Sequence, residues 1–282
     1  MTASVRKHTR WGWHPAWRMS PSGEAAGLAL VAAFALTCTV IATAATAVSL
    51  IARLPLVASM FGWCERLAGS SPWWLGVPAA ACLAGLVGGG AAVSARHLRA
   101  RPAKDAPSVV VVDTAQLFAY SLGGRGGQVV TSRGLLEQMG PEERRVIFAH
   151  EAAHVRLGHH RLLWLADLAA LNPLMRPLSK RMRFALERAA DEEAVRAVGD
   201  RALVARTVGR AALLSFDRAP SHALSIDGSG VVGRVEALLS PAEVAFPAGP
   251  LLASAAVIVV ACSLAWSQWT HMVVLAHHLC AL

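Results

Sequence analysis

The sequence predicts a mainly α-helical integral membrane protein, with about three transmembrane helices and one smaller α+β domain. Hydrophobic residues make up 55% of the 282 residues and charged residues only 16%, and the mean hydropathy is +0.45. An ordinary soluble domain carries more charge, and long uncharged runs are expected inside a bilayer. The polar segment that separates these runs is long enough to fold as a domain of its own.

Three apolar runs are long enough to cross a bilayer, at about 25–52, 73–95 and 248–266. A cleaved signal peptide is the alternative for the first run, which is longer than the apolar core of such a peptide. The runs divide the chain into a basic N-terminus at 1–22, a membrane region with two spans at 23–95, a polar domain at 96–247, and a third span with a short tail at 248–282.

Charge predicts the orientation of these spans in the cell membrane. Positive residues precede the first run and follow the second, whereas the loop between the two runs carries few charges. The positive-inside rule therefore places the N-terminus and the polar domain in the cytoplasm and the C-terminus outside. The net charge of +9 is concentrated at these flanks, so a nucleic-acid partner is not expected.

The five cysteines do not form a CxxC pair, which argues against a zinc ribbon or a thioredoxin-like site. Cys64 and Cys280 are expected on the outer side of the membrane. They can form a disulfide there or remain free thiols, and the sequence leaves both readings open.

The polar domain begins with strand-like stretches at 108–113, 117–122 and 128–132. The last two are expected to form a hairpin across the glycine-rich turn between them. A helix should begin after Gly140 and end near Leu157. The apolar run at 162–171 is too short to span and predicts a buried or interfacial helix. Further helices are expected from Ser179 to Val198, at 200–216 and at 230–239.

The helix ending near Leu157 contains the pentapeptide HEAAH, which begins at His150 and ends at His154. Residues four apart share one face of a helix, so both imidazoles can bind one metal ion. Glu151 can then act on the open side of the metal as a general base, as in zinc peptidases. Because a five-residue pattern also arises by chance, further ligands must be found elsewhere in the chain.

A catalytic zinc site needs a third protein ligand. Glu187 and Asp191 lie four apart on the predicted helix that ends at Val198. Glu187 is the candidate third ligand, and Asp191 can accept a hydrogen bond from a ligand histidine. The alternative interpretation of this pair is an acidic helix surface.

His160 is a competing third ligand, because it would complete the metzincin pattern HExxHxxGxxH. That pattern requires glycine at position 157, where this chain has Leu157, and the glycine follows one residue later. His159 and His160 are therefore expected at the helix end, outside the ligand set.

The stretch "VVTSRGLLEQMGPEERRVIFAHEAAHVRLGHH", followed by "LERAADEEAV", resembles the membrane-embedded gluzincin metallopeptidases. It is similar to the β-lactam-sensor/signal-transducer peptidase family, actinobacterial type, and to the related CAAX prenyl protease and heat-shock membrane protease family. The resemblance covers about residues 108–240 and implies a zincin-like fold for this domain. It further implies that His150, His154 and Glu187 bind one Zn²⁺, with Glu151 as the catalytic base and Asp191 supporting a ligand.

An integral-membrane zinc metalloendopeptidase is the function that this resemblance implies, using a zinc-activated water, with a role in regulatory or signalling proteolysis. Its partners would be the lipid bilayer and a protein or peptide substrate, with a transcriptional repressor as one candidate. The alternative is a membrane signalling protein whose domain binds zinc but hydrolyses little. Only about fifteen residues follow the third run, so β-lactam sensing is not expected. His222 is a weak candidate for stabilising the oxyanion, and a surface-loop histidine is the other interpretation.

Overall fold

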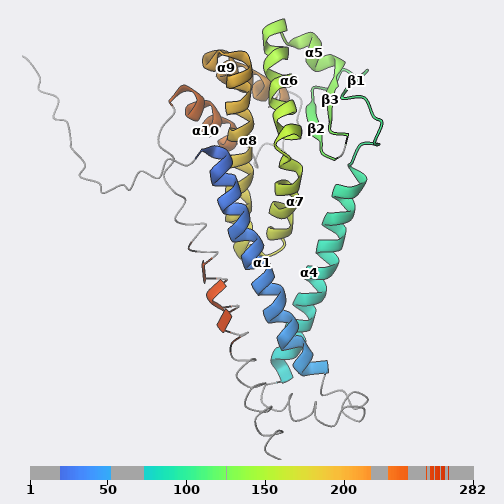
Figure 1. The fold of residues 1–282 in the computed structure, drawn as a ribbon, viewed down its shortest axis with the longest axis vertical. Coiled ribbons are helices and arrows are strands. Elements are labelled where there is room, and N and C mark those ends of the chain that lie inside the picture. The colour runs from blue at the N-terminus through green and yellow to red at the C-terminus, as the bar shows by residue number, and fades with distance from the viewer. Residues whose placement is uncertain are drawn as a thin grey trace, which may run out of the picture.

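The computed structural model describes residues 20–51, 73–124, 126–216 and 228–240, with scattered residues between 252 and 266. Helices make up most of this part of the chain, and a three-stranded sheet lies at one end (Figure 1). The prediction of a mainly helical fold with a small sheet is confirmed, and two of its helices are candidate membrane helices. The third predicted span, at about 248–266, falls largely outside the described residues and stays a prediction, as do the domain boundaries.

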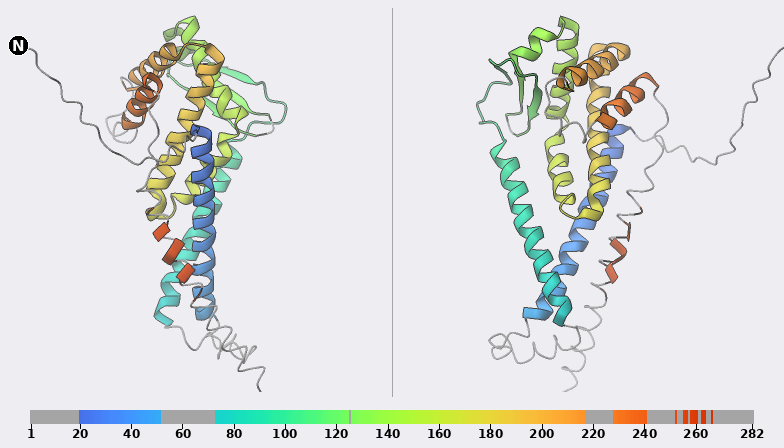
Figure 2. Two further views of the ribbon diagram at one scale, coloured as in Figure 1. Left: turned by 60° about the vertical axis from the view of Figure 1, so that its left-hand side comes forward. Right: turned by 180° about the vertical axis from the view of Figure 1, so that it is seen from behind.

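Among the residues that the structure describes, two helices are long and apolar enough to cross a membrane. They are α1 (Pro21–Ile51) and α4 (Trp73–Arg99), with candidate spans of 27 and 24 residues. Figure 2 shows the two helices meeting at one end of the molecule and diverging toward the sheet. Other helices of the chain enter the space between them.

The sheet consists of β1 (Val109–Val112), β2 (Ala119–Leu122) and β3 (Gln128–Ser132) in the order β1-β3-β2. The antiparallel pairing of β2 with β3 confirms the predicted hairpin. The parallel pairing of β1 with β3 was not predicted. These two strands are not consecutive, because β2 lies between them in the sequence. All residues of β3 are buried, and β2 is left at an edge of the sheet.

Short helix α5 (Arg133–Gln138) follows β3 directly, and Leu135 N–H donates to Ser132 Oγ at its start. The motif helix α6 (Pro141–Arg156) begins after Gly140, as predicted. It ends where Gly158 adopts a left-handed conformation with φ of +65°, which glycine reaches without steric cost. α7 (His159–Ala169) begins at the next residue.

α7 and α8 (Arg176–Val198) form a helical hairpin, with the short 3₁₀ turn η1 (Pro173–Met175) between them. The prediction that Ser179 caps this second helix is wrong. The helix begins three residues earlier, because the turn at Asn172 already directs the chain into helical geometry, and Ser179 is buried inside it. Gly199 ends α8, as predicted, with φ of +83°.

α8 contributes to two hydrophobic cores. Its first half packs with α7 and α1 around a cluster that includes Ala32, Leu178 and Met182. Its second half packs with α6, α9 (Arg201–Phe216) and α10 (Gly228–Leu239) around Ala194 and Val204. α8 therefore connects the candidate membrane helix α1 with the helix that carries HEAAH.

Glu143, in the first turn of α6, joins the start of this helix to α9. Its carboxylate accepts hydrogen bonds from Gly140 N–H at 2.8 Å and from Arg210 Nη1 at 2.6 and 2.8 Å. Partial burial raises the pKa of Glu143, but these donors outweigh burial and hold the pKa below its ordinary value. The charged carboxylate therefore stabilises the fold above the ordinary pKa, and this contribution is lost as the pH falls through the lowered one.

We expect Glu143→Gln to lower the thermal unfolding midpoint at pH 7, with a loss of about 1 kcal/mol or more because a helix cap and an ion pair are both weakened. The difference from wild type should shrink as the pH falls below the ordinary pKa of 4.5. Thermal denaturation in detergent micelles at several pH values measures both effects. Glu142→Gln is the matched control, because Glu142 pairs with Arg145 on the exposed surface, and an equal loss in both variants would contradict the assignment.

Candidate metal centre

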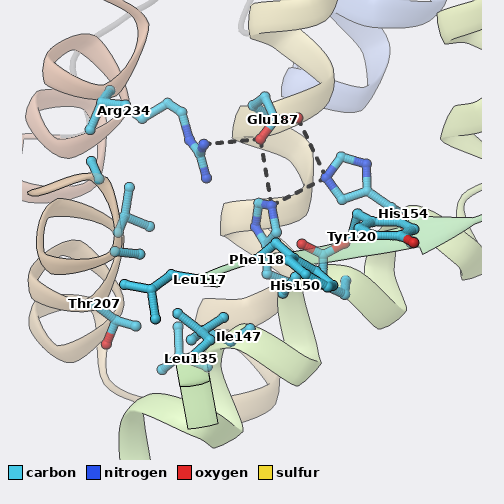
Figure 3. Close-up of a pocket in the computed structure, with 18 of the residues that line it drawn as sticks. Leu117, Phe118, Tyr120, Leu135, Ile147, His150, His154, Glu187, Thr207 and Arg234 are labelled. Carbon is cyan, nitrogen blue, oxygen red and sulfur yellow. Dashed lines mark hydrogen bonds and ion pairs between the residues drawn. The ribbon is translucent and has the colours of Figure 1, made fainter. Parts of the chain in front are cut away.

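Packing of α6 against α8 brings three donor side chains together (Figure 3). His150 and His154 lie one helical turn apart on α6, with their Nε2 atoms 3.2 Å apart. Glu187, on α8, places Oε2 3.5 Å from His150 Nε2 and Oε1 3.6 Å from His154 Nε2. These three residues form a group that could hold a metal ion.

The spacing of the donors fits a zinc ion. Zinc bonds of about 2.0–2.1 Å with tetrahedral geometry place neighbouring ligand atoms about 3.3 Å apart. The three observed separations, 3.2, 3.5 and 3.6 Å, are of this size. Two imidazoles and one carboxylate are also a donor set of catalytic zinc sites, and three protein ligands leave a fourth position open.

Asp191 lies one turn beyond Glu187 on α8 and is almost fully buried. Its Oδ1 lies 3.0 Å from Nδ1 of His150, the ring nitrogen that faces away from the other donors. A carboxylate at this position fixes which nitrogen carries the proton and leaves Nε2 free as a ligand.

Arg234 on α10 completes the arrangement, and the sequence reasoning missed it. Its Nε and Nη2 donate to the two oxygens of Asp191 at 2.8 and 2.7 Å, and Nη1 lies 2.9 Å from Glu187 Oε2. One guanidinium therefore contacts both Asp191 and Glu187, and Figure 3 shows its contact with Glu187. The available signal was indirect: two buried carboxylates require a cation nearby.

His159 lies outside the candidate ligand group, as predicted, but it is not at the surface. Its ring is buried, and its Nδ1 lies 2.9 Å from Nδ1 of His154. The left-handed turn at Gly158 starts a new helix, so His159 belongs to the first turn of α7 and faces back toward α6. His159 therefore contacts Nδ1 of His154, just as Asp191 contacts Nδ1 of His150.

His160 does not belong to the group of candidate ligands, which removes the metzincin interpretation. Its ring lies against Gly123, where an added Cβ would approach His160 Cγ to 2.0 Å. His222, considered as an oxyanion donor, lies outside the described residues.

The candidate ligands and Glu151 line one pocket of about 560 Å³. Residues 117–121, at and before β2, form one wall of the pocket, and apolar residues of α5, α6, α9 and α10 form another. The apolar wall includes Leu135, Ile147, Val208 and Val231. Burial raises the pKa of the Glu151 carboxyl, and the nearby charge of His150 opposes this effect only in part.

The charges of the candidate ligands and of their neighbours offset one another without a metal ion. Burial lowers the pKa of His150, but the nearby carboxylates of Asp191 and Glu187 outweigh it and raise the pKa to about 9. Burial lowers the pKa of His154 to about 4. Burial also raises the pKa of Glu187, but His150 and Arg234 hold it well below its usual range. A bound cation would therefore replace the proton on His150.

A helix-borne HExxH with a glutamate donor from a second helix defines the class of metallopeptidases to which this site corresponds. The model of peptidase family M48 matches residues 92–173, which include the sheet, HEAAH and α7. The chain thus carries an M48 metalloendopeptidase domain whose candidate zinc-binding group is His150, His154 and Glu187. Glu187 lies beyond the matched residues, so its inclusion rests on the geometry.

The comparison with curated proteins and the comparison with solved structures give no match. The finer resemblance to the signal-transducer peptidases therefore stays a prediction.

We expect Asp191→Asn to weaken zinc binding by about 10- to 100-fold, because an amide cannot accept from both Arg234 donors and still orient His150. Zinc retained after dialysis against a graded series of chelator concentrations measures the change. Glu192→Gln is the matched control, because the neighbouring Glu192 pairs with Arg201 instead. Equal zinc affinity in the two variants would remove Asp191 from the site.

Proposed function

We propose that this protein is an integral-membrane zinc metalloendopeptidase in which His150, His154 and Glu187 hold one Zn²⁺ and Glu151 is the general base. The observation that supports this most directly is the convergence of three donors from two helices at zinc-like spacing, with a further carboxylate in the same pocket. A structural zinc site would need no such additional carboxylate beside an open position.

Zinc at these three donors supplies Lewis-acid chemistry, which polarises a peptide carbonyl and makes water a nucleophile near neutral pH. Glu151 accepts the proton that water loses and returns it to the departing amine. The raised pKa of Glu151 suits both steps, because a general base and acid works best when its pKa lies near the working pH. Asp191, Arg234 and His159 hold the donors in place.

The pocket suggests how a peptide binds. Residues Phe118 to Ser121 line it, and β2 lies at an edge of the sheet. An extended substrate can add to this edge as a further strand, with backbone hydrogen bonds that do not depend on sequence. The apolar wall would then accept one side chain next to the bond that is cut. The substrate is a protein or peptide, and a transcriptional repressor is a candidate by resemblance alone.

The proposed placement in the membrane combines two observations, which are the two candidate spans and the charge asymmetry of the sequence. α1 and α4 cross the bilayer, the peptidase domain lies in the cytoplasm with the N-terminus, and the C-terminus lies outside after a third span. The four segments 1–22, 23–95, 96–247 and 248–282 then correspond to the basic N-terminus, the first two spans, the peptidase domain and the last span.

We expect Glu151→Gln to keep its zinc and to lose peptide hydrolysis by about 10²- to 10⁴-fold, the contribution typical of a general base. Zinc content is measured on the purified full chain, and cleavage is followed as new internal N-termini among co-expressed proteins by mass spectrometry. Glu142→Gln, on the exposed surface of the same helix, is the control that should cleave like wild type.

Retained cleavage in Glu151→Gln would exclude this residue as the base. Full zinc with equally little cleavage in wild type and variant would favour a zinc-binding signalling domain. Wild-type protein without zinc would sink both proposals.

The proposed topology predicts that Cys64, in the loop between the first two spans, faces the outside. A variant that keeps Cys64 as its single cysteine should react with a membrane-impermeant maleimide in intact cells under reducing conditions. A cysteine placed instead at the exposed Glu137 on α5 should react only after permeabilisation. The reverse pattern would invert the topology.

A further inference from the structure

The helical hairpin formed by α7, η1 and the first half of α8 lies in the space between α1 and α4 (Figures 1 and 2). A continuous apolar core joins this hairpin to the first half of α1. On α1 the core contains Ala25, Leu28, Ala29, Ala32 and Ala35, and on the hairpin it contains Ala166, Ala169, Met175, Leu178 and Met182. The hairpin therefore lies beside a segment assigned to a membrane span.

The tip of the hairpin also lies against the middle of α4. Leu171 occupies the space above Gly89, where an added Cβ would be 3.0 Å from Leu171 Cδ2, and Leu168 lies over Gly90. Nearer the cytoplasmic end of α4, Trp164 Nε1–H donates to Ser94 Oγ at 3.1 Å. These contacts show which residues of α7 and α4 lie side by side along the two helices.

From these contacts we propose that the tip of the α7–α8 hairpin is immersed in the cytoplasmic half of the bilayer, which is the partner that its exposed apolar surface fits. This inference rests on the proposed membrane placement of α1 and α4. On α4, Gly89 lies six residues inside the end of the apolar run, which is about 9 Å. On α1, the shared core reaches Ala35, about 15 Å inside the start of the apolar run at residue 25. One leaflet of the hydrocarbon layer is about 15 Å thick.

The backbone N–H groups of the turn meet a main requirement for backbone at this depth, which is that polar groups be satisfied within the protein. Leu171 N–H and Asn172 N–H donate to carbonyls of α7, at 3.2 and 3.1 Å. Leu174 N–H donates to Asn172 Oδ1 at 3.0 Å, and Met175 N–H to Asn172 O at 2.9 Å. Between them, Pro173 has no N–H to satisfy. Leu174 is 65% exposed at the tip.

Several charged groups on the hairpin have partners suited to low dielectric. Asp167 accepts from Arg96 and lies 2.8 Å from His97 Nε2, both at the cytoplasmic end of α4, and it also pairs with Arg183. Ionisable groups at membrane depth are normally paired in this way. Arg176, close to the tip, donates to Ala170 O at 3.4 Å, and its long side chain can reach toward the headgroups.

A further pair fits the same boundary. Glu24, in the first turn of α1, is buried and accepts from Arg181 Nε at 2.6 Å. The candidate metal centre lies beyond the other end of α7, about 20 Å from the tip along the helix. It is thereby held about 5–10 Å outside the hydrocarbon layer. The substrate class that this favours is a polypeptide segment at the membrane surface.

The test is nitroxide labelling of Leu174→Cys in a full chain without its native cysteines, reconstituted in phosphatidylcholine–phosphatidylglycerol liposomes. Collisions of the label with oxygen, which concentrates in the bilayer, are compared with collisions with a water-soluble chromium oxalate. Val87→Cys on α4 is the reference for immersion, and Leu213→Cys on α9 is the aqueous reference. The three native side chains are similarly exposed, at 65%, 63% and 68%.

We expect oxygen collisions to exceed chelate collisions at positions 174 and 87, and the reverse at position 213. Immersion at 87 with an aqueous label at 174 would overturn the hairpin proposal and leave the membrane placement intact. An aqueous label at 87 would instead overturn the placement of α4. Zinc content verifies the fold of each labelled variant. If labelling lowers the zinc content, the rate at which an impermeant maleimide alkylates Leu174→Cys in opened vesicles is measured instead of the nitroxide collisions. Rapid alkylation overturns the proposal.

Discussion

The buried carboxylate of Asp191 is the interaction on which the candidate site depends. It contacts His150 on α6 and Arg234 on α10, while α8 carries it in the chain. A carboxylate that is only 2% exposed costs several kcal/mol to desolvate unless charge and hydrogen bonds offset the loss. These partners supply both, so the relative positions of three helices are coupled to the orientation of one candidate ligand.

The same principle organises the rest of the polar interior. Glu187 is held between Arg234 and the two histidines, and Asp167 between cations of α4 and α8. Each carboxylate joins different helices. Hydrophobic packing brings the helices together, and the ion pairs select one register among the alternatives that packing alone would permit.

Local patterns in the sequence were sufficient to predict most of the helices and strands and part of the candidate site. HEAAH and the Glu187–Asp191 spacing depend only on helical periodicity, so both could be placed before any tertiary information. Arg234 could not, because it lies 43 residues from its partner Asp191, on a helix that carries no motif pointing to the site. The role of His159 depended on the single left-handed residue Gly158, whose effect on direction is a matter of three-dimensional geometry. The parallel partner of β3 was missed because β1 and β3 are separated in the sequence by β2.

The pairing of Glu24 with α8 has a consequence for dissecting this protein. Removing α1 would take away the carboxylate that Arg181 contacts and would uncover the apolar surface of α7 and α8 that packs on α1. A catalytic fragment cut at the start of the polar segment would thus lack part of its own interior. Replacing α1 with an unrelated anchor would restore attachment to the membrane but not that interior, so expression strategies should treat α1 as part of the folded enzyme.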